Sequence, residues 1–153
     1  MSDAQIYIGI NALVLPAWIL LVFLPGAGLT RRLVHSGLYP IVFGLIYIVF
    51  ISRALVFGET VEGTGFGSLE AVMKAFDTPA GLLTGWTHYL VFDLFVGAWI
   101  GRDALARNVS HFVRVPGQVG SFILGPVGLL VYLAGRWLTG RGGFFLDAPG
   151  HRG

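Results

Sequence analysis

Four long apolar stretches, separated by shorter polar segments, dominate the chain. They cover residues 6–24, 38–57, 79–100 and 117–138. Each is close to the roughly 20 residues that an α-helix needs to cross the hydrocarbon layer of a bilayer. A backbone exposed to lipid must satisfy its own hydrogen bonds, and the stretches lack the alternation of barrel strands, so they predict helices. The expected fold class is all-α, an integral membrane four-helix bundle.

The first stretch is expected to be retained rather than cleaved. Its leader, MSDAQ, contains no Lys or Arg, whereas a secretory signal has a basic start and a shorter apolar core. Pro16 is a place where this helix would kink. We expect residues 1–153 to form a single multi-pass domain, in which residues 139–153 are a flexible tail.

A short helix is predicted between the second and third stretches. SLEAVMKAF repeats apolar residues at helical spacing, Ser68 is a plausible N-cap, and Asp77 to Pro79 would end the segment. We expect this helix to lie in the membrane interface. It either anchors the loop or acts as a lid over a site on that face, which Glu70 would then reach. Its apolar positions are Leu69, Val72, Met73 and Phe76.

The composition supports a membrane protein. The chain is 55% hydrophobic and only 12% charged, whereas soluble domains carry about 25% charged residues. The net charge of +2 and the lack of a basic tract argue against a nucleic-acid partner. With no cysteine, the chain has no disulfide, thiolate metal site or cysteine nucleophile.

Charge in the connecting segments favours one orientation. Arginines follow the first and third stretches, and these two loops share one face of the predicted bundle. The positive-inside rule places that face in the cytoplasm and both termini on the other side. Arg136, Arg141 and Arg152 near the C-terminus weaken this contrast.

The third stretch carries the candidate chemistry. Every fourth residue from 81 to 101 is small or polar, and such a row drifts by only about 40° per step around a helix. Small residues let membrane helices approach closely, so Asp93 in this row is expected to face another helix. A charge facing lipid would cost at least about 2.5 kcal/mol. The row consists of Gly81, Gly85, Tyr89, Asp93, Gly97 and Gly101.

His88 precedes Asp93 by five residues, which places the two about 140° apart around the helix and about 7.5 Å apart along it. They form two edges of one wide face. An imidazole and a carboxyl group in a dry pocket can act as acid and base, because the surroundings decide which holds the proton. The alternative is that both are structural hydrogen-bonding groups. Side chains expected at compatible depth, and so candidates for substrate binding, are Asn11, Arg53, Trp86, Tyr89, Glu70 and Tyr132.

Neither a metal nor a cofactor is expected. His88 and Asp93 lack the i, i+4 spacing of a helical ligand pair, and the predicted membrane helices hold no second histidine.

GWTHYLVFDLFVGAWIGRDA, followed by FILGPVGLLVYL, strongly resembles the abscisic-acid-deficient-4-like membrane proteins. LPAWILLVFLP, IYIV and GSLEAVMKAFDTPAGLLTGW extend the resemblance to roughly residues 10–135. HYLVFDLFVG is its specific part. Ala98 stands where the family's usual FVGRWI has a basic residue. The chain shows no long plastid-targeting leader, so we expect a bacterial inner-membrane protein.

The resemblance implies a role in carotenoid metabolism, since plant members of the family are implicated in making neoxanthin from violaxanthin. That conversion isomerises an epoxide to an allenic alcohol and needs an acid and a base but no redox cofactor. His88 and Asp93 are our candidates for these roles. A protein that binds a polyene or terpenoid without turnover, and a small proton-linked transporter or assembly factor, are the alternatives. Membrane lipids are expected partners, and a homo-oligomer is left open.

Overall fold

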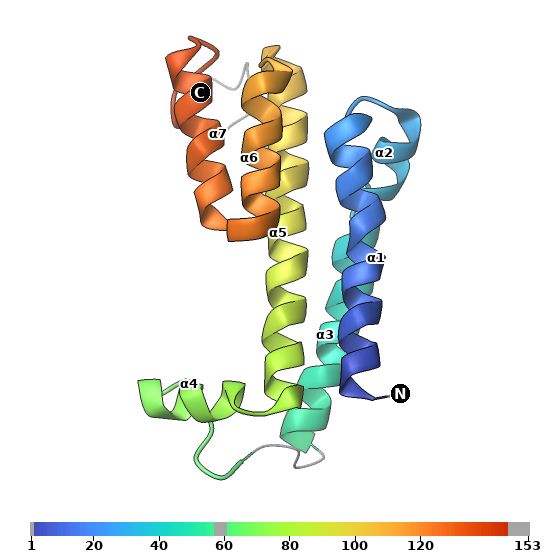
Figure 1. Ribbon diagram of the computed structural model, residues 1–153, viewed down its shortest axis with the longest axis vertical. Coiled ribbons are helices and arrows are strands. Elements are labelled where there is room, and N and C mark those ends of the chain that lie inside the picture. Colours follow the sequence, from blue (N-terminus) through green and yellow to red (C-terminus); the bar gives the residue numbers. More distant parts are fainter. Residues whose placement is uncertain (1, 57–60, 147–153) are drawn as a thin grey trace, which may run out of the picture. The chain divides into compact units, whose positions relative to one another are not determined.

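The computed structural model describes residues 2–56 and 61–146, and over these residues the chain is all-α with no strand. The all-α class is therefore confirmed. Position 57 of the second predicted stretch and residues 147–153 of the predicted flexible tail lie outside the described residues. Seven helices form in the described part of the chain: α1 (Asp3–Phe23), α2 (Gly28–Leu33), α3 (Leu38–Val56), α4 (Leu69–Phe76), α5 (Pro79–Arg107), α6 (His111–Leu124) and α7 (Pro126–Leu138) (Figure 1).

Two segments of the described chain are long and apolar enough to cross a membrane. They are Asp3–Phe23 and Gly28–Ala54, and the second takes in α2 and most of α3. The four-helix membrane bundle is not confirmed. α1 has one row of buried residues, whereas its other faces leave large apolar side chains such as Ile8 and Ile19 exposed. An apolar helix with so little of its surface buried in the chain suits contact with lipid.

The prediction of one helix over residues 117–138 is wrong. α6 ends at Leu124 and α7 begins at Pro126, with Gly125 between them at φ 57°. Glycine takes this left-handed conformation without steric cost. Proline lacks an N–H and has a fixed φ, so it suits the first position of a new helix. The Gly-Pro pair therefore ends one helix and starts the next.

α6 and α7 form a tightly packed antiparallel hairpin (Figure 1). A Cβ added at Gly128 would lie 1.9 Å from the backbone N of Ser121, and one at Gly117 would lie 2.6 Å from Cβ of Tyr132. Each helix is only about 20 Å long, which is less than the roughly 30 Å of a hydrocarbon core. Because α7 runs antiparallel to α6, the chain after α7 returns to the C-terminal end of α5.

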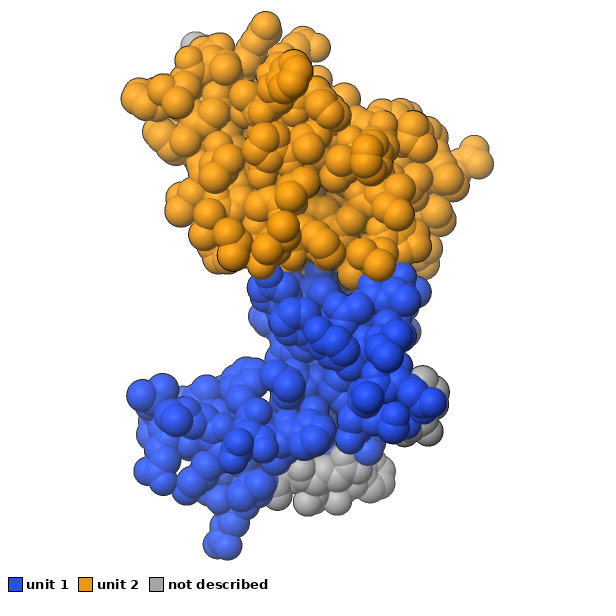
Figure 2. All heavy atoms as spheres, in the orientation of Figure 1, with its two compact units in different colours: residues 1–13, 39–91 blue, residues 14–38, 92–153 orange. Residues whose placement is uncertain are grey.

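The chain divides into two compact units (Figure 2). Unit 1 comprises residues 1–13 and 39–91, and unit 2 comprises residues 14–38 and 92–153. The division falls within α1 and within α5. As a result, His88 belongs to unit 1 and Asp93 belongs to unit 2.

Glycines on α5 are sites of close packing within each unit, as the spacing of the row predicted. In unit 2, a Cβ at Gly97 would lie 2.5 Å from the ring of Trp18 on α1, and one at Gly101 would lie 3.2 Å from the side chain of Gln118 on α6. Nearby, Ile100, Ala104, Val109, Tyr132 and Leu133 form a buried apolar cluster.

Candidate functional site

Unit 1 contains a cavity of about 440 Å³ lined by residues of α3, α4, α5 and the segment before α4. Its walls are mainly apolar, with a few polar groups, as is typical of sites for small hydrophobic ligands. The lining residues with polar side chains are Tyr47, Thr64, Thr78, Thr84 and His88. The others are Ile51, Ala54, Gly65, Phe66, Ala75, Phe76, Gly81 and Gly85.

Helical spacing explains how α3 and α5 contribute to this cavity. Tyr47, Ile51 and Ala54 follow i, i+4, i+7 spacing along α3, so they share one face. The cavity residues of α5 also share one face of their helix, because they follow i, i+3, i+4, i+7 spacing from position 81 to position 88. The rings of Tyr47 and His88 are tilted toward each other with centroids 6.0 Å apart. His88 is exposed in the isolated chain, so it stands at the edge of the cavity.

α4 closes one side of the cavity. The short helix is confirmed, and Ser68 is its N-cap, with Oγ accepting a hydrogen bond from the Ala71 N–H at 3.2 Å. A Cβ at Gly85 would lie 2.2 Å from the ring of Phe76, and one at Gly81 would lie 1.7 Å from the carbonyl oxygen of Ala75. These two glycines therefore allow the C-terminal end of α4 to lie directly on α5.

Glu70 does not line this cavity. Its side chain is 79% exposed and forms an i, i+4 ion pair with Lys74 at 2.9 Å. Glu70 and Lys74 line a separate surface hollow along α4. Glu70 is therefore not placed at this cavity, and its role in substrate binding stays a prediction.

Three other predicted residues gather where α1 meets α5 in unit 1. The indole N–H of Trp86 donates to Oδ1 of Asn11 at 3.3 Å, and the rings of Trp86 and Tyr89 stack with centroids 5.1 Å apart. Tyr7 adds a further ring 5.7 Å from that of Trp86. None of these residues lines the cavity. Asn11 thus joins two helices, which is the usual role of an amide in a helix interface.

Arg53 and Asp93 do not line the cavity either. Arg53 is half-buried on α3, one position before Ala54, which does line it. Asp93 is buried on α5 within unit 2, at 9% exposure. That burial agrees with its expected place on the packed side of the helix, and its catalytic role stays a prediction.

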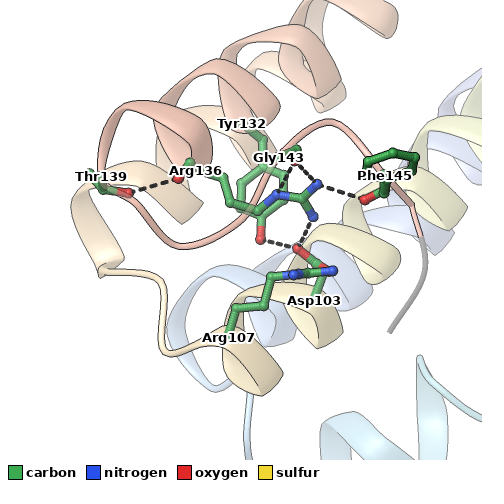
Figure 3. Close-up of polar contacts among 7 residues, drawn as sticks. All are labelled: Asp103, Arg107, Tyr132, Arg136, Thr139, Gly143 and Phe145. Atoms are coloured by element: carbon green, nitrogen blue, oxygen red, sulfur yellow. Dashed lines mark hydrogen bonds and ion pairs between the residues drawn. The ribbon is translucent and has the colours of Figure 1, made fainter. Parts of the chain in front are cut away.

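Tyr132 was expected near His88, but it lies in unit 2 against Asp103. Its hydroxyl donates to Asp103 Oδ2 at 2.6 Å, and the guanidinium of Arg136 donates to the same oxygen at 2.6 Å (Figure 3). Arg107 Nε donates to Oδ1 at 2.7 Å. The hairpin is the reason for this placement, because α7 returns beside the C-terminal part of α5.

The surroundings of Asp103 favour its charged form. Burial alone would raise the pKa of the Asp103 carboxyl group. The hydrogen bonds from Tyr132, Arg107 and Arg136, together with the charge of Arg136, outweigh burial and hold that pKa below its usual value. Arg136 also donates to the carbonyl oxygens of Gly143 and Phe145, which ties the segment after α7 to this cluster (Figure 3).

Sequence reasoning found some of these groups and missed others. Asp103, which forms ion pairs with Arg107 and Arg136, was not among the predicted site residues. The i, i+4 spacing of Asp103 and Arg107 was an available signal. Tyr47 was missed, although its spacing to Ile51 and Ala54 marks one face of α3. In the part of the chain that the structure describes, no three His, Asp or Glu side chains are grouped to hold a metal ion.

Comparison with known proteins agrees with the resemblance noted from the motifs. The pattern that defines the ABA DEFICIENT 4-like family matches residues 5–132. The protein ABA DEFICIENT 4, chloroplastic, from Arabidopsis thaliana is 28% identical over 103 residues. That match covers 63% of this chain but only 46% of the plant protein. No solved structure matches the chain.

Proposed function

The chain belongs to the ABA DEFICIENT 4-like family, and from this premise we propose that it is a membrane protein of xanthophyll metabolism that binds one end group of a carotenoid. The observation that carries the proposal is the cavity of unit 1, which is mainly apolar and has His88 and Tyr47 on its wall. The carotenoid itself comes from the resemblance to the plant members of the family.

The cavity suits the end of a polyene rather than its whole length. Its volume of about 440 Å³ lies within the range of small-ligand sites. The apolar wall formed by Ile51, Phe66 and Phe76 suits a cyclic hydrocarbon end group. The imidazole of His88 and the hydroxyl of Tyr47 are groups that can hydrogen-bond a hydroxyl or epoxide oxygen on that ring.

The reaction that we propose is an isomerisation of an epoxy- or hydroxy-carotenoid. In the epoxide case, a proton is delivered to the epoxide oxygen as a C–O bond breaks, and a proton is lost from a carbon atom. The atoms balance without any exchange of electrons, so the step needs no redox cofactor. We assign proton transfer at the cavity to His88. Asp93 is the second group, proposed from its place on the same helix.

Binding without turnover is the second candidate function. Among the described residues that line the cavity, only His88 has an imidazole, and no carboxylate or amine side chain lines it. A general acid and a general base must both lie within hydrogen-bonding reach of the substrate. A single such group on the wall is what a carrier or presenting protein would need.

A turnover assay separates these functions. The wild-type protein, His88→Ala and Asp93→Asn are purified in nanodiscs, bound pigment is extracted, and epoxy- and hydroxy-carotenoids are then added to each. Glu70→Gln is the control, because Glu70 is exposed outside the cavity. An isomer that forms with wild type and the control but not with His88→Ala or Asp93→Asn supports the isomerase. Bound pigment without product in any variant supports the binding protein, and neither pigment nor product contradicts both.

We propose that α1, α3 and residues 79–100 of α5 cross the membrane, so that Arg102 and Asp103 lie beyond the spanning segment. The apolar surface of α1 and α3 supports this assignment. Location in a bacterial inner membrane stays a prediction, and fractionation of the producing cells into inner membrane, outer membrane and soluble material tests it.

A further inference from the structure

The two units differ in the sign of their exposed charges. In the described part of unit 2, the acidic side chains are Asp93 and Asp103, and both are buried. The exposed charged residues there are arginines: Arg31, Arg32, Arg102 and Arg141. In the described part of unit 1, four acidic residues are exposed, Asp3, Glu62, Glu70 and Asp77, and the side chain of Lys74 is 44% exposed in its ion pair with Glu70. The burial of Asp103 against Arg136 thus leaves unit 2 with a surface of positive charge.

Polar contacts within unit 2 join the segments that carry its arginines. Arg102 Nη1 is 3.3 Å from His35 Nδ1, which joins α5 to the segment after α2. Arg114 donates to the carbonyl oxygens of Leu21 at 2.7 Å and Val22 at 3.2 Å, which joins the start of α6 to the end of α1. The segments that carry Arg31, Arg32 and Arg102 therefore belong to one end of unit 2.

The segment after α7 reaches the same end. A Cβ added at Gly142 would lie 2.8 Å from Nη1 of Arg107, and Arg136 holds the carbonyl oxygen of Phe145 at 2.7 Å. Arg141, which precedes Gly142, therefore lies close to the C-terminal end of α5, the helix that also carries Arg102 and Arg107. In a four-span arrangement this arginine would lie on the opposite face of the membrane.

Large apolar side chains are exposed beside these arginines. Phe112 is 88% exposed at the start of α6, and Leu29 is 55% exposed on α2. Leu105 and Phe144 are also exposed. Arginine next to exposed aromatic and aliphatic groups is typical of a membrane interface, where the apolar groups enter the lipid and the guanidinium groups remain at the headgroups. A nucleic-acid partner would contact the arginines but would leave the apolar side chains exposed to water, so it fits this surface less well than lipid does.

We propose that the surface formed by Arg31, Arg32, Arg102, Arg141 and Phe112 binds the anionic phospholipid headgroups of one membrane leaflet. The charge is complementary, since the exposed ionised groups of described unit 2 are positive. Juxtamembrane arginines strengthen attachment to anionic lipid by a factor on the order of five each. This surface belongs to unit 2 and the ligand cavity to unit 1, so loss of the lipid preference and loss of carotenoid binding are separable.

Lipid-dependent stability tests the proposal. The full-length protein is placed in nanodiscs of phosphatidylcholine alone or mixed with phosphatidylglycerol, and Tm is measured at low and high NaCl. Wild type is expected to have a higher Tm in the anionic discs, and high salt is expected to reduce the gain because it screens exposed charges. Arg31→Gln/Arg32→Gln/Arg102→Gln should lose the gain. Lys74→Gln, which removes a positive charge from unit 1, should keep it.

Two further variants keep the test decisive if the triple variant does not fold. Arg31→Gln/Arg32→Gln changes only exposed side chains of α2 and should lose part of the gain. Arg31→Lys/Arg32→Lys/Arg102→Lys preserves charge and should retain most of it. An equal Tm of wild type in the two lipids would overturn the proposal. A full rise in Tm in the glutamine variants would also overturn it. So would a loss of this rise in Lys74→Gln as large as the loss in the glutamine variants.

Discussion

The guanidinium of Arg136 donates to Oδ2 of Asp103 across 2.6 Å, although the two residues are 33 positions apart in the chain. Arg136 is fully buried and Asp103 is 6% exposed. Two buried ions of opposite charge offset part of each other's desolvation, and Tyr132 and Arg107 supply further hydrogen bonds to the carboxylate. The pair fixes α7 and the segment after it against the end of α5.

Replacing Arg136 with Met should strongly destabilise the protein. Removing one partner of a buried ion pair costs about 3–5 kcal/mol, because the other charge is left buried. The free energy of unfolding, measured in detergent by chemical denaturation, should fall by that amount. Arg141→Met is the control, since Arg141 is exposed and should change the value by less than about 0.5 kcal/mol. Equal effects of the two substitutions would contradict the role given to Arg136.

The same cluster should make the stability of the folded protein depend on pH in the acidic range. The pKa of Asp103 is lowered in the folded protein, so its contribution is fully present above the ordinary pKa of about 3.9 and is lost as the pH falls through the lower folded value. Asp103→Asn should therefore be less stable than wild type at neutral pH, and the difference should shrink below about pH 4. Thermal unfolding across a pH series measures it. A difference that is constant from neutral to acid pH would show that the charge of Asp103 contributes nothing.

Gly128→Ala should disrupt the α6–α7 hairpin. The added Cβ would lie 1.9 Å from a backbone nitrogen, so the two helices must separate. Overpacking of this kind costs about 1–3 kcal/mol or more. Gly44→Ala on α3 is the matched control, because a Cβ there meets nothing within 4 Å. Tm of the two variants in detergent provides the comparison, and equal values would indicate that the hairpin contact is absent in solution.

Single introduced cysteines should show on which side of the membrane the segment after α7 lies. The protein contains no cysteine, so each introduced thiol is the sole target of a membrane-impermeant maleimide. Ser36→Cys and Thr139→Cys should be labelled from the same side of sealed vesicles, because the hairpin brings the chain back to the arginine-rich end. Glu62→Cys should be labelled from the opposite side. Labelling of Thr139→Cys together with Glu62→Cys would instead support a fourth crossing.

Gly85→Ala should weaken ligand binding if the cavity is the carotenoid site. The new Cβ would lie 2.2 Å from the ring of Phe76, which must then move and alter the wall of the cavity. The affinity for an epoxy-carotenoid, measured by the change in its absorbance spectrum, should fall about tenfold, a cost of about 1.4 kcal/mol. Gly9→Ala has no neighbour within 4 Å and should bind as wild type does. Unchanged affinity of Gly85→Ala would place the ligand elsewhere.

Local properties of the chain were enough to predict much of the structure. The apolar stretches predicted the all-α class and the positions of α1 and α3 because helix formation depends on neighbouring residues. Ser68 and the apolar spacing after it predicted α4 and its cap. The glycine row predicted close contacts along α5, since the lack of a side chain permits them whatever the partner. The motifs quoted from residues 10–135, with HYLVFDLFVG as their specific part, pointed to the family that the comparison then showed.

Only the tertiary structure decided which side chains meet. The Gly-Pro pair was visible in the sequence, but apolar content alone cannot distinguish one long helix from two short ones packed together. Because of that difference, Tyr132, which was expected near His88, lies against Asp103 together with Arg136. The same difference also placed the segment after α7 against Arg107 of α5, while His88 shares a cavity with Tyr47. Periodicity reports which face of a helix is apolar, whereas the partner of that face depends on contacts between residues far apart in the chain.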